Sequence, residues 1–305
     1  MKLLFSTGIL VPILMLLSAA TQYAQDDTNP KFNPPKQYYL ALGDSLAFGS
    51  QQIKFNANFP LEPPSAFNTG YVDDLAVMLR GIRPDIQTVN FGCPGETSLT
   101  FINGGCSYTS RGFALHDSYS GSQLAAAISF LQEHHGLVSP ITINLGVNDL
   151  RPLQSICGTD LSCYKAYAPA ILAATRANLD WILGAIRSAA PDAEIITFTN
   201  YDLTVLIDPR FVLFTAFTDV VTDTARSHSV RVADVFSAFN EGPQPATLCS
   251  LTFACTPLQD THPTDAGYAT IAARIWVASD YDRIGTIAWL RGVEAGRGEV
   301  IANAR

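Results

Sequence analysis

Residues 38–49 read Tyr-Tyr-Leu-Ala-Leu-Gly-Asp-Ser-Leu-Ala-Phe-Gly, an apolar run followed by a polar turn that lies between two glycines. The run Tyr38–Leu42 has the large apolar side chains expected of a strand that is buried on both faces. A serine directly after such a strand, with a glycine on either side to allow a tight turn, can expose its hydroxyl as a nucleophile. An ordinary strand-to-helix turn, with Asp44 or Ser45 as the helix N-cap, accounts for the same residues.

The rest of the chain alternates between short apolar runs and amphipathic stretches. Four more runs are expected as buried parallel strands: Ile86–Phe91, Ile141–Leu145, Glu194–Thr199 and Val230–Val235. Apolar residues at helical spacing lie between and after them: Val72–Leu79, Leu124–Leu131, Ile171–Ile186 and Asp265–Ala278. Because parallel neighbours need crossover helices, the pattern predicts an α/β fold, a three-layer, doubly wound, mostly parallel five-stranded sheet flanked by helices.

The composition excludes several classes of protein. The chain has 305 residues with a net charge of -8, 48% hydrophobic and 15% charged residues. The apolar fraction is too high for a disordered chain, and no long uncharged apolar run follows the N-terminus, which argues against a polytopic membrane protein. The acidic balance, without a stripe of basic residues, argues against nucleic-acid binding.

The N-terminus has the pattern of a secretory signal peptide. Lys2 precedes an uncharged apolar stretch, Leu3–Ala20, that ends in small residues. That stretch is near the lower length limit for a spanning helix, so an uncleaved membrane anchor is the alternative. The expected organisation is a signal peptide over 1–24, a leader over 25–37, one domain over 38–280 and a tail of unknown role over 281–305.

Six cysteines support export independently. They fall into pairs that are local in sequence: Cys93 with Cys106, Cys157 with Cys163, and Cys249 with Cys255. Sequence alone cannot choose among the possible connectivities of six cysteines, although proximity favours this local set. A metal site is the alternative, but the CxxC, HExxH and paired-histidine spacings of zinc sites do not occur. Disulfides form in oxidising compartments, so we expect a secreted, extracellular protein.

Three further polar segments stand where an active site is expected. They are Asn90–Ser98, Gly146–Asp149 and Asp260–Thr264. In an open parallel sheet ligands bind outside the carboxyl ends of the strands, where such loops meet. Ester cleavage needs a nucleophile, a base, a group that orients the base, and donors for the oxyanion. Ser45, His262 and an acid beside it supply the first three, and the Gly95 N–H and the Asn148 amide supply the donors.

The four segments, in this order, resemble the sequence blocks of the SGNH hydrolase (GDSL esterase/lipase) superfamily, and together they span Gly43 to Pro263. The resemblance implies an SGNH/flavodoxin-like sheet and an active site in which Ser45 is the nucleophile and His262 the general base. It also implies an oxyanion hole made by the backbone N–H of Ser45, Gly95 and Asn148. The cysteine pairs resemble those of secreted actinobacterial-type members, in which each bridge holds a loop near the site.

Two assignments leave an alternative open. Gly92 also fits the second block, although the pattern Asn-x-x-x-x-Gly-x-Thr favours Gly95. The family's acid commonly stands three residues before the histidine, where this chain has Gln259. Asp260 is the preferred partner of the imidazole, and the Gln259 carbonyl is the alternative, since either group can accept a hydrogen bond from Nδ1.

The acidic residues beside these blocks are expected to have structural roles. Asp44 and Asp149 are expected to hold their loops through hydrogen bonds to the backbone. Glu96, next to the glycine of the second block, is expected on a solvated face, and a position at the border of the pocket is the alternative.

Taken together, the sequence predicts a secreted serine esterase or lipase. Its substrate would be a small-molecule or lipid ester with a short to medium acyl group, because aromatic loops are expected at the rim of the site: Gln51–Asn68, Phe101–Tyr119 and Tyr201–Phe217. Ordinary loop packing is the alternative account of those aromatic residues. We expect no metal or organic cofactor, a monomer, and no stable membrane insertion after signal cleavage.

Two other functions remain open. A polysaccharide deacetylase or a phospholipase would use the same catalytic residues on a different ester. A catalytically silent surface-binding module is the alternative from another class of protein.

Overall fold

The computed structural model describes residues 32–58, 63–158, 160–203 and 211–284. The expected signal peptide lies outside the described residues, as do most of the expected leader and most of the expected tail. None of the helices within the described ranges combines the length and the apolar character that a membrane span needs.

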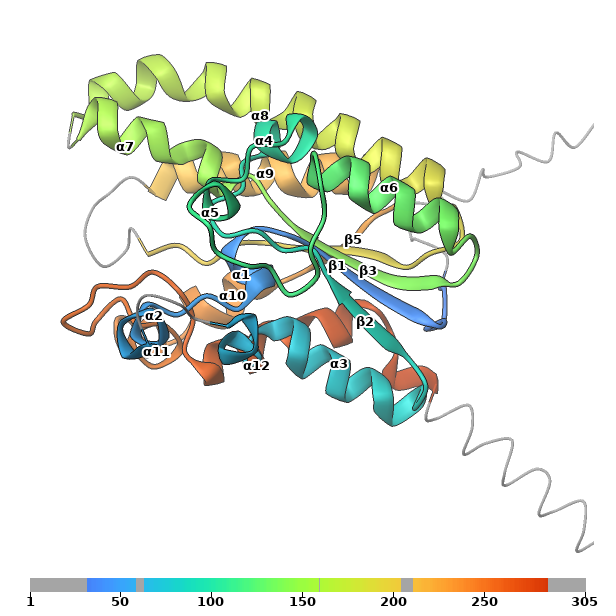
Figure 1. The fold of residues 1–305 in the computed structure, drawn as a ribbon. Helices are drawn as coiled ribbons and strands as arrows, with labels where there is room; N and C mark the ends of the chain where they lie inside the picture. Colours follow the sequence, from blue (N-terminus) through green and yellow to red (C-terminus); the bar gives the residue numbers. More distant parts are fainter. Residues whose placement is uncertain (1–31, 59–62, 159, 204–210, 285–305) are drawn as a thin grey trace, which may run out of the picture.

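The described residues form one five-stranded sheet in the order β2-β1-β3-β4-β5, in which every neighbouring pair is parallel (Figure 1). The strands are β1 Tyr38–Gly43, β2 Gln87–Asn90, β3 Val138–Asn144, β4 Ile195–Phe198 and β5 Arg231–Ala233. This is the flavodoxin-like order, in which the winding reverses between β1 and β3 and a ligand crevice forms at that point. The predicted fold class is confirmed.

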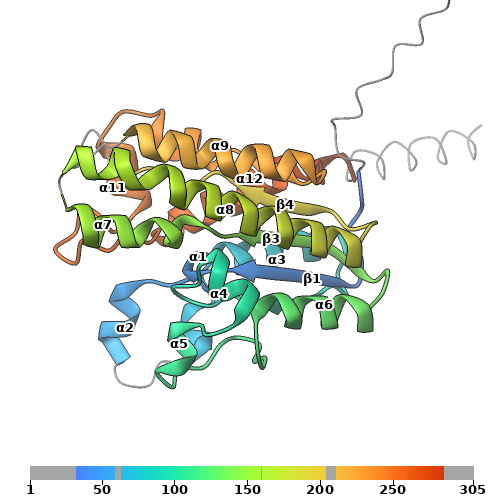
Figure 2. The same cartoon turned by 90° about the horizontal axis from the view of Figure 1, so that it is seen from above.

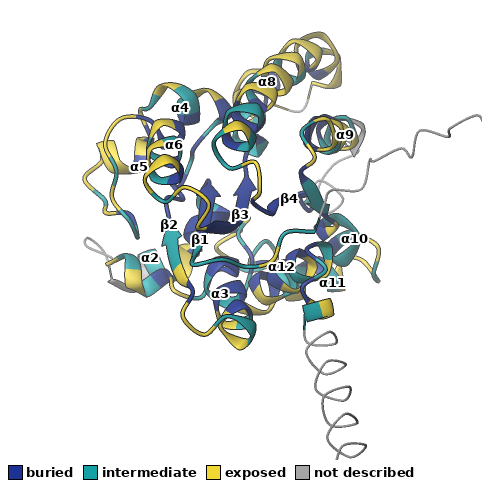
Figure 3. Cartoon of the chain, turned by 90° about the vertical axis from the view of Figure 1, so that its right-hand side faces the viewer, coloured by how far each residue is buried: buried dark blue, intermediate teal, exposed yellow. Residues whose placement is uncertain are grey.

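Helices cover both faces of the sheet, with their exposed sides turned outward (Figure 3). One face is covered by α4 Ser98–Asn103, α6 Gln123–Glu133, α8 Leu161–Ala189 and α9 Phe211–Ser227. The other face is covered by α3 Tyr71–Ile82, α10 Val235–Asn240, α11 Ala246–Leu251 and α12 Asp265–Ala278. Shorter helices lie in the connections: α1 Ser45–Phe48, α2 Gln52–Asn58, η1 Pro64–Phe67, α5 Ser107–Ser110, η2 Val147–Leu150 and α7 Arg151–Cys157. Figure 2 shows the first layer from above, with α8 and α9 side by side.

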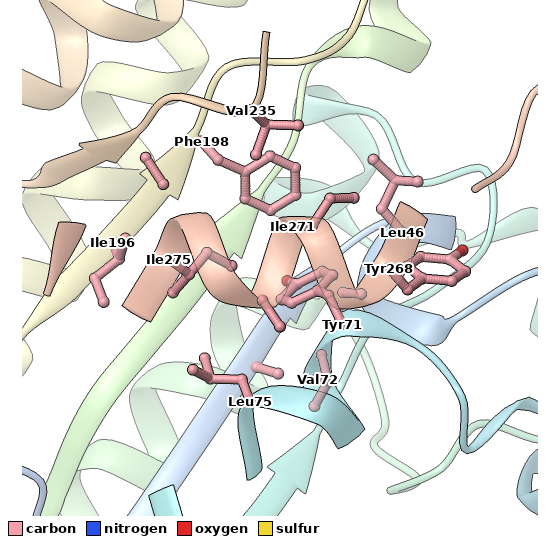
Figure 4. Packing of buried hydrophobic residues seen from close by; sticks show 14 of the residues in the cluster. Leu46, Tyr71, Val72, Leu75, Ile196, Phe198, Val235, Tyr268, Ile271 and Ile275 are labelled. Atoms are coloured by element: carbon pink, nitrogen blue, oxygen red, sulfur yellow. The ribbon is translucent and has the colours of Figure 1, made fainter. Parts of the chain in front are cut away.

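Each helical layer buries its apolar stripe against the sheet. Between the sheet and α12, Phe198 of β4 lies close to Ile271 and Ile275, and Tyr71 and Leu75 of α3 complete the same cluster (Figure 4). All five side chains are buried. Burying such side chains removes apolar surface from water and contributes about 1.5–3 kcal/mol for each fully buried one.

Two helices differ from the sequence-based expectation. The stripe that begins at Ile171 belongs to α8, which starts earlier, at Leu161, because the Asp160 side chain accepts the N–H of Ser162 at 2.8 Å and caps the helix. The expected loop Tyr201–Phe217 contains the start of α9. That helix forms because Phe217 continues an apolar stripe: Phe217, Val220, Val221 and Ala225 are all buried against the sheet.

A buried ion pair connects strand β5 to residues near both ends of the described chain. Arg231 Nε of β5 lies 2.8 Å from Glu194 Oε1, and Arg231 Nη1 lies 3.0 Å from Asp280 Oδ2. The other Glu194 oxygen accepts the Asn33 N–H at 3.0 Å. Burial raises the pKa of Glu194, while the bonds from Asn33 and Arg231 counteract that rise. Asn33, which precedes β1, is thereby bonded to the residue that precedes β4.

Replacing Arg231 by Met should destabilise the protein by about 3–5 kcal/mol, because the buried Glu194 carboxylate loses its cation. The measurement is urea unfolding followed by circular dichroism. Arg176→Met is the matched control, since the Arg176–Asp223 pair is exposed and should contribute about 1 kcal/mol or less. Equal losses in the two variants would contradict this account of the buried pair.

Candidate active site

The turn after β1 places Ser45 at the start of a short helix. Gly43 has φ +130°, and a Cβ at this position would lie 2.1 Å from the Asn144 carbonyl oxygen, so only glycine fits here. Asp44 is the N-cap of α1, and its Oδ1 accepts the Leu46 N–H at 2.9 Å. Ser45 is therefore the first helical residue at the carboxyl end of a central strand, and the N-cap interpretation of Asp44 is compatible with a half-buried serine.

The turn after β2 lies against the first one. The Cys93 N–H donates to the Gly43 carbonyl at 3.0 Å, and the Glu96 N–H closes the turn onto the Cys93 carbonyl at 3.0 Å. Gly95 occupies the left-handed position of this turn, with φ +84°. Gly92 has a different role, because a Cβ there would lie 2.8 Å from the Cβ of Ala47, so glycine lets α1 approach closely.

The Asn148 amide connects these two turns to the loop after β3. Its Nδ2 donates to the Glu96 carbonyl at 2.9 Å and to Asp44 Oδ2 at 3.2 Å. The next residue, Asp149, accepts the Ser98 N–H at 2.9 Å. The predicted loop-holding roles of Asp44 and Asp149 are thus confirmed by hydrogen bonds to the backbone.

His262 is oriented by a neighbouring carboxylate. Its Nδ1 lies 2.6 Å from Asp260 Oδ1, and Asp260 Oδ2 accepts the Gln52 N–H at 2.7 Å. Burial by itself would raise the pKa of Asp260, but the hydrogen bond and positive charge of His262 and the backbone N–H groups outweigh it and lower that pKa. The loop is fixed by Tyr201, whose hydroxyl donates to the Thr261 carbonyl at 2.7 Å.

Three carboxyl groups surround the Asn148 loop in largely buried positions. Burial raises the pKa of Asp44 to about 7, and burial likewise raises the pKa values of Glu96 and Asp149. The expectation that Glu96 lies on a solvated face is wrong: its side chain is buried, and Gln123 Nε2 donates to it at 3.2 Å. The Glu96 carbonyl accepts a hydrogen bond from Asn148, and this bond holds the residue inside the site.

Ser45, Asn148 and His262 all line one cavity of about 1090 Å³. Gly95 and Asp260, the other two predicted site residues, do not belong to that lining. One wall comes from η2 and the helices α7, α8 and α9 and is mainly apolar: Val147, Leu150, Arg151, Gln154, Tyr164, Leu213 and Phe214. The facing residues are of mixed character: polar Asn200, Tyr201, Asp202, Gln244, Gln259 and Thr261, together with Leu203, Pro245, Ala254 and the disulfide residues Cys249 and Cys255.

The expected aromatic rim is mostly wrong. Of the three segments, Tyr201–Phe217 contributes to the cavity, whereas the described parts of Gln51–Asn68 and Phe101–Tyr119 do not line it. Aromatic residues of those two segments instead pack with Phe48 in a separate cluster around one disulfide: Phe55, Phe67, Cys93, Cys106, Tyr108 and Phe113. The alternative of ordinary loop packing is therefore correct for the described parts of these two loops. Their aromatic rings bury apolar surface against one another and do not face the cavity.

The three disulfides have the local pairing that proximity favours. Their Cα atoms lie 6.4 Å apart in Cys93–Cys106, 5.4 Å in Cys157–Cys163 and 5.2 Å in Cys249–Cys255. Among the described residues, the group with metal-ligand geometry is Cys93, Glu96 and Cys106. Both of its sulfur atoms are consumed by the disulfide, so it does not fit a metal ion.

Comparison with known proteins identifies relatives by both sequence and fold. Residues 41–270 match the model of the GDSL-like lipase/acylhydrolase family. No curated protein matches the sequence.

Solved structures with the same fold include two lipases and an esterase. An extracellular lipase from Streptomyces rimosus is 17% identical, with a TM-score of 0.52 over 79% of this chain and 99% of that one. An acetylxylan esterase from Geobacillus stearothermophilus is 20% identical, with a TM-score of 0.52 over 82% and 96%. A lipase from a goat rumen metagenome is 17% identical, with a TM-score of 0.55 over 81% and 99%. At these identities the likeness establishes the fold.

The buried Asp44 gives the protein a specific pH dependence. Its pKa is raised from 3.8 to about 7, so the folded protein binds this proton more tightly than the unfolded chain does. The stability that the protonated carboxyl group contributes is therefore lost as the pH rises from the unfolded pKa of 3.8 through the folded pKa of about 7. Asp44→Asn cannot ionise and should gain stability relative to the wild type between pH 4 and pH 8, by up to about 4 kcal/mol. Urea unfolding at the two pH values tests this, and a pH-independent difference between the proteins would contradict it.

Proposed function

Given that the chain belongs to the GDSL-like lipase/acylhydrolase family, we propose that it hydrolyses carboxyl esters through an acyl-enzyme formed on Ser45. Family membership makes the protein a carboxylic-ester hydrolase. One observation carries the assignment of residues, the 2.6 Å hydrogen bond from His262 Nδ1 to Asp260. It orients a base that lines the same cavity as Ser45 and Asn148.

In the proposed first step the Ser45 hydroxyl attacks the ester carbonyl carbon while His262 Nε2 accepts its proton. Nε2 takes this role because Nδ1 is engaged by Asp260, which also stabilises the imidazolium. The tetrahedral adduct then collapses to an acyl ester on Ser45, and His262 returns the proton to the departing alcohol. A water molecule activated by the same histidine hydrolyses the acyl ester and restores Ser45.

The developing oxyanion would be stabilised by the backbone N–H groups of Ser45 and Gly95 and by the Asn148 amide. The turn glycine Gly95 can present its N–H because its φ of +84° turns the backbone at this point. Asn148 Nδ2 already has two acceptors, of which Asp44 is the more distant at 3.2 Å. Donation to an oxyanion would therefore weaken the bond to Asp44 first.

The cavity supports a substrate with an acyl group of short to medium length. Its apolar wall suits an acyl chain, and the polar residues opposite suit the alcohol part of an ester.

A polysaccharide deacetylase remains the second candidate, because the acetylxylan esterase from Geobacillus stearothermophilus shares the fold. Turnover of acetylated glycans but not of lipid esters would select it, and turnover of phospholipids would select a phospholipase. A silent binding module would lack turnover altogether.

Export to the extracellular space is part of the proposal. Three disulfides are typical of proteins from oxidising compartments. We propose a signal peptide over residues 1–24, a leader over 25–37, a catalytic domain over 38–280 and a tail over 281–305. The secreted protein would act as a monomer on small-molecule or lipid esters, without metal or organic cofactor and without stable insertion into a membrane.

Ser45→Ala should abolish turnover of a p-nitrophenyl ester without unfolding the protein, because no other group replaces the nucleophile. Asn148→Ala should retain the nucleophile and lower kcat by about 10²–10³-fold with a smaller change in KM, since an oxyanion donor acts mainly in the transition state. Steady-state kinetics and circular dichroism test both variants. Unchanged turnover by folded Ser45→Ala, or failure of a fluorophosphonate probe to label the wild type, would refute the mechanism.

Asp260→Asn should lower kcat by about 10²–10⁴-fold, because the carboxylate holds the tautomer and stabilises the imidazolium. Gln259→Ala is the matched control, since it keeps the backbone carbonyl that is the alternative acceptor. It should leave kcat within about threefold of the wild type. A loss of less than tenfold in Asp260→Asn would instead favour the Gln259 carbonyl as the orienting group.

A further inference from the structure

Two disulfide-bridged loops stand at the open end of the proposed active site. Cys157–Cys163 joins the end of α7 to the start of α8, and Cys249–Cys255 joins α11 to the loop after it. Figures 1 and 2 show the α7–α8 connection and the loop after α11 projecting at the same end of the molecule, beyond the carboxyl ends of the strands. Residues beside both bridges line the cavity.

Both loops carry large aliphatic side chains that face solvent. Ile156 is 62% exposed and Leu161 is 45% exposed beside the first bridge, and Leu258 is 40% exposed beside the second. We call these three residues the mouth surface. A single exposed aliphatic residue is ordinary, whereas several around one cavity mark a contact surface.

The mouth surface adjoins the cavity lining on two sides. Leu161 precedes Tyr164 by one helical turn on α8, and Tyr164 lines the cavity. Leu258 is the neighbour of Gln259, which lines the cavity from the opposite side. A molecule resting on the mouth surface would therefore lie at the entrance to the site that holds Ser45.

The charge around the mouth indicates what kind of partner fits. Residues 242–259 contain no charged side chain, and neither do residues 152–159. Around them the cations Arg151 and Lys165 are matched by the anions Asp160 and Asp202, of which Arg151 and Asp202 line the cavity, while the whole chain carries a net charge of -8. An anionic surface would find no cluster of cations here and would be repelled by the chain as a whole. An apolar mouth with few charges fits a lipid surface without net charge.

We propose that the mouth surface docks on lipid aggregates that carry no net charge, so that an ester lying in the aggregate can enter the cavity. This proposal rests on the proposed ester hydrolysis and specifies that the substrates include aggregated lipid esters. Rigid bridges at both loops keep the aliphatic side chains exposed together, because they fix the backbone on each side of the entrance.

The test measures binding of the full-length Ser45→Ala protein to phosphatidylcholine vesicles by flotation. In that background the triple variant Ile156→Ser, Leu161→Ser, Leu258→Ser should lower the partition coefficient by at least about tenfold, because its aliphatic groups no longer enter the lipid surface. The matched control is Val77→Ser with Val277→Ser. These valines are 63% and 67% exposed on α3 and α12 and do not line the cavity, so binding should stay within about twofold.

The same substitutions in the active protein separate this proposal from ester hydrolysis itself. Turnover of dissolved p-nitrophenyl acetate should stay within about twofold of the wild type, which also shows that the variant is folded, while turnover of an emulsified ester should fall about tenfold. Absence of p-nitrophenyl acetate turnover in the wild type would refute ester hydrolysis, whatever the vesicles show. If the triple variant does not fold, Leu258→Ser alone is measured in the same assays, with an expected loss of about threefold.

Several outcomes would overturn the docking proposal while leaving ester hydrolysis intact. The docking proposal is overturned if the Ser45→Ala protein does not bind the vesicles, or if the mouth and control variants bind them equally. It is also overturned if binding requires anionic lipid. A dimer in gel filtration that the mouth variant dissociates would assign the surface to a second copy of the chain, and impaired binding of acetylated xylan by that variant would assign it to a glycan.

Discussion

The Asn148 amide is the interaction on which the arrangement of the site depends. Its two hydrogen bonds, to the Asp44 carboxylate and the Glu96 carbonyl, join loops that follow three different strands. Those strands are neighbours in the sheet, so their carboxyl ends bring the loops together. Glycine at position 43 lets the first loop approach the third strand, and glycine at 92 lets α1 lie against the second loop.

This arrangement buries three carboxyl groups, which is unfavourable for their ionised forms. Asp44, Glu96 and Asp149 are drawn inward because their carboxylates or carbonyls are needed as acceptors, and burial raises the pKa of each carboxyl group. His262 lies in the same region, and its imidazolium form partly opposes the rise in the pKa of Asp44 and contributes to the lowered pKa of Asp260. The polar groups that hold the loops in place are thus also the groups that set the electrostatics of the proposed reaction.

Local patterns predicted the strands and most long helices, because a buried parallel strand and an amphipathic helix each leave a periodic trace in sequence. The helix Asp265–Ala278 has the expected bounds because Thr264 caps it and accepts the Gly267 N–H. The burial of Glu96 and the lining of the cavity could not be predicted in this way. Which aromatic loops bury among themselves and which face the cavity depends on contacts between segments distant in sequence.

The fold class and the four polar segments that supply the candidate site are predictable from the sequence, because each of these is a short-range pattern of residue types. Which of those residues meet depends on the tertiary structure. It places the Asp260 carboxylate on His262 Nδ1, directs the Asn148 amide to Asp44 and Glu96, and assembles the cavity from helices α7, α8 and α9 and the loops that face them. The reason is physical: a hydrogen bond is sensitive to a few tenths of an ångström, and only the packed sheet and its helices bring distant loops within that distance.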